Sequence, residues 1–330
     1  MKQSGVALIL VLWILSILML MAGSFSLTMR RESAGIIAIK ANTEASIQAQ
    51  AGIVIAQAML LNEDETKRWR VDGSIYEIET ENAKTRIRIL SETGKVDINS
   101  VTSNLLHQVL MHAPLEKQKQ LNLENAILDW RDEDEITRPF GAEKTEYHAA
   151  KLHYTPRNKP FRSLEELQMV RGMNTEILDW MKPIFTVYAA GQTEVDLHLA
   201  TRDVLNVLPE VDANLLDVYF LVRQQNIINH APPPAIPRSA NSSQAMSQDT
   251  EATTESEVIP GISVVMVSVE TLLDNDSQAA VQVMMEKIDG ANNLPFQILT
   301  WQNQADNATP SLFSNQMNSF VIAHYFEPTI

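Results

Sequence analysis

Cysteine is absent from this chain of 330 residues, so the chain has no disulfide framework, thiol nucleophile, cysteine metal site or lipoprotein anchor. Glycine is scarce, and its 11 residues are scattered without forming a phosphate-binding loop. The metalloprotease helix motif and the nucleophile elbow are also missing. The seven histidines lie far apart, with no pair at the spacing of helical zinc ligands. We therefore predict that the chain is not an enzyme. A membrane-tethered enzyme is a further possible class, but no group of residues in the sequence forms a recognisable catalytic site.

Positive charge is also in deficit. The 26 Lys and Arg residues are outnumbered by 41 Asp and Glu, which gives a formal net charge of −15. Such a surface repels the phosphate backbone of nucleic acids and suits basic partners or bound cations. The length allows about two domains, and a hydrophobic content of 45% is ordinary for a globular protein once a membrane segment is allowed for.

Proline does not occur before Pro114, and the chain opens on a long apolar segment. Met1–Gly5 is a short polar leader, and Val6–Leu27 follows with only small or hydroxyl residues among its apolar ones. About 20 mostly apolar residues suffice for a helix to span a membrane. Apolar residues then recur at helical spacing as far as Leu61, so we predict one helix from Val6 to Leu61, on the order of 80 Å long.

Two other interpretations of this segment remain open. A secretory signal could end at Ala22-Gly23-Ser24, although the apolar block is long for such a signal, and a plain N-terminal membrane anchor has the same composition. Arg30 and Arg31 follow the apolar run while only Lys2 precedes it. The positive-inside rule therefore does not clearly place the N-terminus in the cytoplasm.

The rest of the chain alternates between strand-like and helix-like patterns. Strands are predicted at residues 74–79, 85–90, 262–269, 279–287 and 296–301. Helices are predicted between them at residues 103–112, 121–130, 163–170, 174–185, 201–207 and 213–224. The Pro-, Ser- and Thr-rich stretch from His230 to Glu257 cannot bury enough apolar surface to fold, which predicts a linker or long loop.

The N-terminal segment resembles a type IV pilin-like leader, which a membrane peptidase cuts after the glycine. The run from Gly5 to Trp13 is similar to the K-type minor pseudopilin of type II secretion systems. The resemblance covers about Gly5 to Gln225. It implies cleavage between Gly5 and Val6, with Val6 as the modified, methylated N-terminus. It also implies an α+β fold with a long N-terminal transmembrane and spine helix, a small pilin-like antiparallel sheet and a large inserted helical domain of the sterile-alpha-motif or helix-hairpin-helix type.

The same resemblance predicts how the chain is divided. The expected units are a leader at 1–5, the transmembrane and spine helix at 6–61, the first part of the sheet at 62–95, the inserted helical domain at 96–228, the linker at 229–260, and the second part of the sheet with the tail at 261–330.

An acidic stretch from Asp129 to Glu146 is the most specific polar cluster. Hard cations need several oxygen ligands that converge from a short loop. Asp132, Asp134 and Glu143 fall at the first, third and twelfth places of an EF-hand count, but Ile136 and Thr137 occupy places that need an oxygen ligand and a glycine, so this is not an EF-hand. The alternative from the residues is a solvated acidic loop in which Asp129 caps a helix.

The acidic stretch resembles the calcium-binding loop of K-type pseudopilins. The shared pattern begins at Asp129-Trp130 and runs through Gly141-Ala142-Glu143 to Tyr147. The resemblance implies calcium held by Asp129, Asp132, Asp134, Glu143 and Glu146. Lys144 and Thr145 depart from a pattern that is usually acidic there, which removes ligands.

Residues 164–174 contain the hydrophobic–x–Gly–hydrophobic core of a helix-hairpin-helix around Gly172. DNA-binding versions use the glycine to bring backbone amides to a phosphate. Between Pro160 and Ala190, however, three basic residues stand against four acidic ones, which offers no phosphate track. The hairpin is better interpreted as a packing element, and a membrane-anchored periplasmic DNA-uptake protein is the alternative function.

The resemblance implies a non-enzymatic minor pseudopilin that sits in the inner membrane with its body in the periplasm. Its expected partners are the I- and J-type minor pseudopilins and the prepilin peptidase, and not nucleic acid. Most pilin-like chains carry a glutamate five residues into the mature helix, where this chain has Leu10. Because that glutamate neutralises the N-terminal amine of a neighbouring subunit, its absence predicts a place at the pseudopilus tip, where assembly begins.

Overall fold

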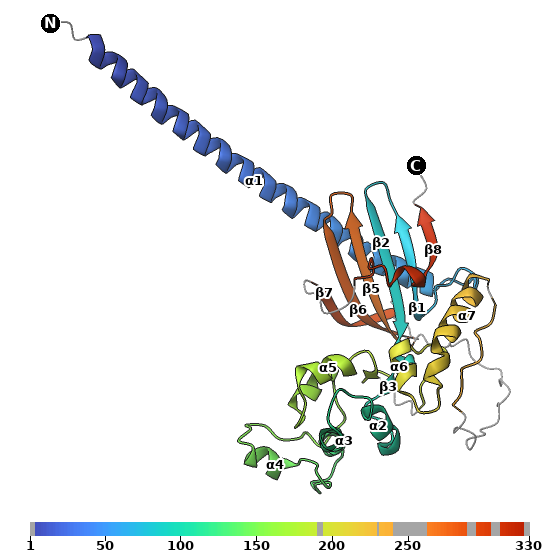
Figure 1. Ribbon diagram of the computed structural model, residues 1–330. Helices are drawn as coiled ribbons and strands as arrows, with labels where there is room; N and C mark the ends of the chain where they lie inside the picture. The colour runs from blue at the N-terminus through green and yellow to red at the C-terminus, as the bar shows by residue number, and fades with distance from the viewer. Residues whose placement is uncertain are drawn as a thin grey trace.

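The computed structural model describes residues 4–189, 194–229, 231–239, 263–288, 295–304 and 311–326. Its first element is the helix α1, Ser4–Leu60, which is 57 residues long and projects far beyond the rest of the molecule (Figure 1). The predicted long apolar helix is confirmed, with ends that differ by one or two residues from the predicted Val6 and Leu61.

The C-terminal half of α1 packs on a sheet through a stripe of small and apolar residues. Its buried residues recur every three or four positions and are Ala41, Ala45, Ala49, Ile53, Ala56 and Leu60. Four alanines let the helix axis lie close to the sheet, and Gly52 allows the closest approach. A Cβ at Gly52 would lie only 2.6 Å from Cγ1 of Val269. The C-terminal half of α1 therefore packs closely on the sheet for two reasons. Its apolar side chains are buried there, and the alanines and Gly52 have too little side chain to hold the helix away from the strands.

The sheet has six strands in the spatial order β7-β6-β5-β2-β1-β8. In chain order they are β1 Asp72–Glu79, β2 Ala83–Ser91, β5 Val264–Leu273, β6 Gln278–Lys287, β7 Phe296–Gln304 and β8 Val321–Phe326. Five of these correspond to predicted strands. Residue 262, at the start of one prediction, lies outside the described residues.

The expectation of an antiparallel sheet is wrong at one edge, where β8 pairs with β1 in parallel. The sheet is therefore mixed. β7 and β8 follow each other in the chain but form opposite edges of the sheet, so the chain must cross the whole sheet between them. That crossing brings β8 alongside β1 in the same direction.

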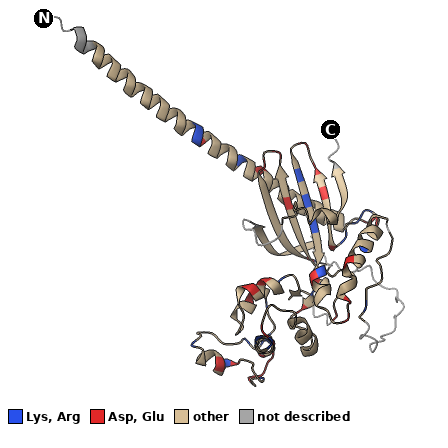
Figure 2. Cartoon of the chain, viewed as in Figure 1, with Lys and Arg blue, Asp and Glu red and all other residues tan. Residues whose placement is uncertain are grey.

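Buried charges on three neighbouring strands hold this crossing segment. Glu77, Arg86 and Glu270 stand directly opposite one another on β1, β2 and β5. Figure 2 shows the basic residues on β2 between acidic ones on the flanking strands. Arg86 donates hydrogen bonds to the carbonyl of Leu312 at 2.8 Å and to Asn318 at 2.9 Å. The tail thus adds hydrogen bonds to a buried charged face on which Arg86 also pairs with Glu77 at 2.7 Å.

A second core lies below the sheet in a block of short helices (Figure 1). They are α2 Ser103–Leu110, α3 Lys117–Arg131, α4 Lys144–Ala149, α5 Thr175–Met181, α6 Arg202–Val207 and α7 Leu216–Ile228, with 3-10 turns η1 Glu92–Gly94, η2 Leu164–Met169 and η3 Ala213–Leu215. A two-residue parallel pair, β3 Val96–Asp97 with β4 Phe185–Thr186, joins the beginning of the block to its middle.

The helical predictions are confirmed in position more than in extent. The helix predicted at 163–170 is a 3-10 turn, and the one predicted at 174–185 ends at Met181 because Phe185 pairs with Val96 in the small sheet. The pattern did not predict α4, whose six residues are too few to show a helical period.

The predicted linker begins against the helical block. The amide of Asp212 donates to the carbonyl of Pro237 at 2.9 Å, and Val211 forms a bridge with Arg238. The described residues 231–239 therefore extend the helical block beyond residue 228. The remainder of the predicted linker falls within residues 240–262, which lie outside the described residues.

Candidate functional site

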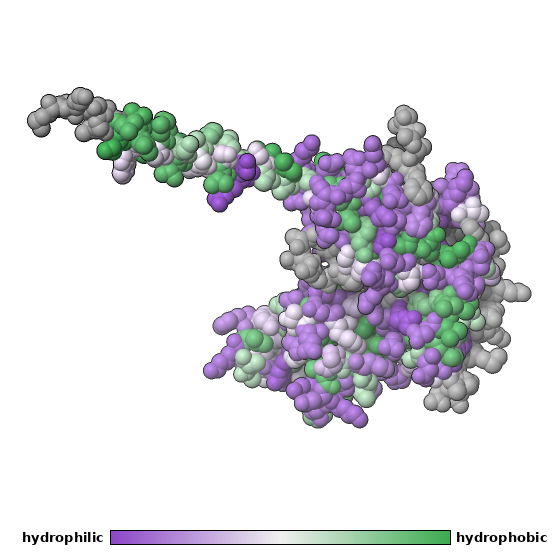
Figure 3. Space-filling model, turned by 45° about the horizontal axis from the view of Figure 1, so that its top comes forward, coloured by the Kyte–Doolittle hydropathy of each residue, from purple (hydrophilic) through white to green (hydrophobic). Residues whose placement is uncertain are grey.

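The projecting part of α1 presents a long row of exposed apolar side chains (Figure 3). Within the described residues, one helix is long and apolar enough to cross a membrane. No charged residue occurs between Val6 and Met29. Every side chain described in this stretch is exposed, Leu10 included.

Exposed apolar residues continue along α1 after Arg31, on the side that faces away from the sheet. Ile36, Ile39, Ile47 and Val54 are each more than 60% exposed, whereas Ala49 on the opposite side is fully buried. An apolar face of this length on a monomer marks a surface that binds other protein or lipid. We call the exposed side of residues 36–54 the outer spine face.

The predicted cleavage site lies at the start of the same helix. Gly5 and Val6 both fall in the first turns of α1, whose first described residue is Ser4. Cleavage between them and modification of Val6 stay predictions.

The acidic loop is built around Asp129, which α3 places in the interior with no exposed surface. The guanidinium of Arg138 donates to Oδ1 of Asp129 at 2.8 Å, and the amide of Ala142 donates to Oδ2 at 2.9 Å. A Cβ at Gly141 would lie 2.0 Å from Oδ2, so only glycine lets the loop wrap this closely around the carboxylate. Asp129 therefore stabilises the loop by accepting hydrogen bonds from residues within it, and it does not cap the helix.

The other predicted ligands of calcium have partners of their own. Asp132 forms an ion pair with Arg138, and Oδ1 of Asp134 accepts the amide of Ile136 at 2.7 Å. Oε2 of Glu146 accepts the amide of Glu143 at 2.9 Å in a capping box that begins α4. Each of these bonds stabilises the local backbone without an ion.

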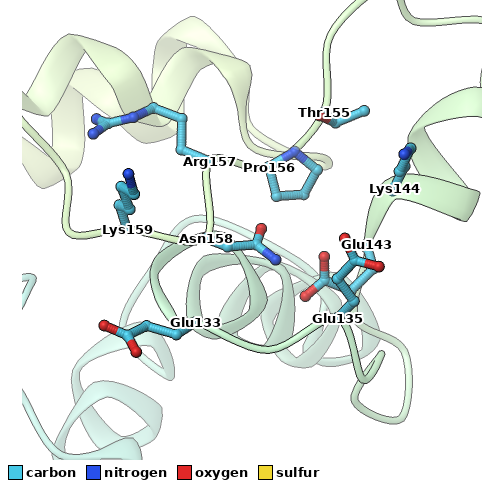
Figure 4. A pocket seen from close by; sticks show the side chains of 9 residues that line it. All are labelled: Glu133, Glu135, Glu143, Lys144, Thr155, Pro156, Arg157, Asn158 and Lys159. Atoms are coloured by element: carbon cyan, nitrogen blue, oxygen red, sulfur yellow. The ribbon is translucent and has the colours of Figure 1, made fainter.

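Of these remaining predicted ligands, Glu143 is the one that is buried as a residue. Its Oε1 has no hydrogen-bond partner, and its side chain lies beside that of Glu135 (Figure 4). Burial, and then the nearby charges of Asp129, Asp132, Asp134 and Glu135, raise the pKa of Glu143 to about 7. The two glutamates line a cavity of about 460 Å³ together with basic residues, Lys144 and Arg157 among them.

The predicted calcium ligands do not come together as a metal site. Within the described ranges, no group of three or more His, Cys, Asp or Glu side chains could hold a metal ion. Calcium takes six to eight oxygen ligands, and the oxygens of Asp129 that would start such a shell are already bonded within the chain. The donor set therefore does not fit calcium. The sequence analysis did not identify Arg138 as part of this loop. The sequence feature that could have indicated it is its position as the one basic residue between the acidic run Asp129–Glu135 and Glu143.

The hairpin around Gly172 packs against the interior. Gly172 has a φ of +91°, Leu167 and Val170 are buried, and the amide of Arg171 donates to the hydroxyl of Tyr147 at 2.9 Å. A backbone amide at the turn is thus used inside the domain. This geometry favours the interpretation of the hairpin as a packing element.

Comparison with known proteins gives consistent results. A family model for the type II secretion system (T2SS) protein K matches residues 86–190. The type II secretion system protein K of Klebsiella pneumoniae is 25% identical over 225 residues, which cover 61% of this chain and 68% of that protein. The corresponding protein of Aeromonas hydrophila is 23% identical over 247 residues, which cover 66% and 72%.

A solved structure is also similar, namely a chain in the crystal structure of the GspK-GspI-GspJ complex from the type 2 secretion system of enterotoxigenic Escherichia coli. It has 11% sequence identity and a TM-score of 0.49, and the match covers 84% of this chain and 99% of that chain. The family model and both curated relatives name the same protein, so this chain is similar to the type II secretion system protein K over the matched residues.

Proposed function

We propose that this chain is a minor pseudopilin that occupies the tip of the type II secretion pseudopilus and initiates its assembly. It sits in the inner membrane through the first part of α1, with the sheet and helical block in the periplasm. Its partners are the I- and J-type minor pseudopilins. The observation that carries the proposal is the 57-residue helix α1, with its apolar first part and outer spine face, on a chain similar to protein K.

Two features support a place at the tip. The helical block lies at the end of the sheet remote from the projecting part of α1, where it would obstruct a subunit stacked above (Figure 1). Leu10 provides no carboxylate for the N-terminal amine of a subunit already in place. An unpaired charge at membrane depth costs on the order of 3 kcal/mol. Such a chain is disfavoured as an incoming subunit and suited to be the first.

Crosslinking tests the proposed position. A photo-crosslinking residue at Ile39, on the outer spine face, should capture one set of partners below this chain, and the same residue at the buried Ala49 should capture none. Recovery of the protein at regular intervals along purified filaments would contradict the tip position, because a tip subunit occurs once in each filament.

Processing provides a separate prediction. Gly5→Val should leave the leader attached, because the peptidase needs a backbone without a side chain at the position before the cut. Mass analysis of the membrane-extracted protein should find Val6 at the N-terminus of the unmodified chain and Met1 in the variant. An N-terminus at Phe25 would instead indicate a secretory signal.

A further inference from the structure

The acidic loop contains a cation of its own. Arg138 comes from the middle of the loop and turns its guanidinium back toward the end of α3. There it pairs with both Asp129, at 2.8 Å, and Asp132. The backbone amide of the same residue lies 3.3 Å from Oδ2 of Asp129. One residue thus bridges the two carboxylates that a metal ion would join and offsets part of their charge.

This arrangement and a bound divalent ion exclude each other. Oδ1 of Asp129 and Oδ2 of Asp132 share one guanidinium nitrogen, so an ion at those oxygens would have to displace it. The displaced arginine would lose two charge-assisted hydrogen bonds, and its permanent positive charge would repel the ion that replaced it.

We propose that Arg138 is the resident cation of the acidic loop and takes the place of calcium, so that the helical block folds without a metal ion. The inference concerns the stability of this block and does not depend on the proposed position at the tip. Two other arginines near the loop have different partners. Arg131 donates to the carbonyls of Ile98 and Val101, and Arg157 pairs with Glu166, so neither forms an ion pair with a predicted ligand.

The structure also shows what removal of Arg138 would leave. Oδ1 of Asp132 and Oε1 of Glu143 are buried without hydrogen-bond partners even when the arginine is present. Without its guanidinium, Oδ1 of Asp129 and Oδ2 of Asp132 lose their charged partner and join these atoms as oxygen donors, while Oδ2 of Asp129 keeps the amide of Ala142. Several carboxylates that converge in this way repel one another until a cation binds. A variant without the arginine should therefore acquire a response to calcium.

The test uses the full chain in detergent, melted with excess calcium or with chelator. The melting temperature of the unmodified protein should be the same in both conditions, and the dialysed protein should hold no calcium by elemental analysis. Arg138→Gln should melt several degrees lower in chelator and recover part of that loss in calcium. Arg157→Gln is the matched control, because it removes a comparable ion pair and should lose stability equally in both conditions.

Two results would overturn the inference. Calcium that raises the melting temperature of the unmodified protein, or that remains bound after dialysis, would show that an ion and not Arg138 closes the loop. Failure of calcium to stabilise Arg138→Gln would show that the arginine does not occupy a cation site. If that variant does not fold, Arg138→Lys keeps a positive charge and should melt independently of calcium, and the measurement on the unmodified protein still decides.

Discussion

Asp72→Ala should lower the free energy of unfolding by about 3–5 kcal/mol, as expected when one partner of a buried ion pair is removed. The side chain of Asp72 is 1% exposed at the start of β1, and Arg70 donates to its Oδ2 at 2.7 Å. Arg223 of α7 lies 3.7 Å from the same oxygen and is itself 5% exposed. The substitution would leave this guanidinium buried without a counter-charge, at the point where the helical block meets the sheet.

The contacts of Arg223 explain why this pair matters more than others. Its two terminal nitrogens donate to the carbonyls of Ala200 and Asp72, at 3.1 and 3.3 Å, so it connects α7 to the segment before α6 and to β1. Glu79→Ala on the same strand is a matched control. Glu79 is 45% exposed and lies 3.7 Å from Lys84, so its loss should cost less than about 1 kcal/mol. Thermal unfolding of the full chain in detergent measures both, and equal losses would contradict the prediction.

The same carboxylate should make stability depend on pH. Burial alone would raise the pKa of Asp72, but the charges of Arg70 and Arg223 and a hydrogen bond from Ser74 outweigh it and lower the pKa below the usual value. The folded protein then binds fewer protons than the unfolded chain, so this part of the stability is complete above about pH 4, the pKa of an unfolded aspartate, and is lost as the pH falls through the native pKa.

Asp72→Asn should reveal this dependence. The variant cannot ionise, so the stability that separates it from the unmodified protein should be large at pH 6 and shrink as the pH falls below about 4. Melting curves at a series of pH values measure that difference. A difference of the same size at pH 6 and pH 3, two pH values on either side of the unfolded pKa of about 4, would mean that the charge of Asp72 does not contribute to stability.

Periodic patterns predicted the elements of the fold well wherever an element was long. The mostly apolar run of 22 residues from Val6 to Leu27 and the alternation in β1, β2, β5, β6 and β7 are patterns that few other structures satisfy. Shorter elements were missed or misjudged for the same reason. α4 has six residues, and β3 and β4 have two each, so their formation depends on tertiary contacts and not on a repeated pattern.

The return of the tail to the sheet was also beyond a local pattern. Residues 320–326 are mostly apolar, but their pairing with β1 depends on the segment before β8, which Arg86 and Glu270 bind. The partner of the acidic loop was likewise not predictable from a local pattern. Its acids predicted a cation, and only the three-dimensional structure shows that Arg138 supplies one from nine residues along the chain from Asp129.

The second large effect is expected at the contact between the spine and the sheet. Gly52→Leu should destabilise the protein by about 1–3 kcal/mol or more, the cost of overpacking a close contact. Even the Cβ of the new side chain would lie 2.6 Å from Val269 and 3.4 Å from Ile87, both in strands that α1 covers. The helix can accept the larger residue only by moving away from the sheet, which would expose the stripe of alanines that Gly52 interrupts.

Gly35 provides the matched control on the same helix. Nothing lies within 4 Å of a Cβ at this position, so Gly35→Leu should stabilise the isolated protein by up to about 1 kcal/mol through helix propensity alone. Thermal unfolding and limited proteolysis near residue 60, both on the full chain in detergent, should therefore separate the two variants in sign. Equal behaviour would show that α1 is not seated tightly on the sheet. In the proposed pseudopilin the same packing fixes the sheet and helical block relative to the membrane segment, because α1 includes that segment and also packs on the sheet. Gly52→Leu should therefore also reduce secretion.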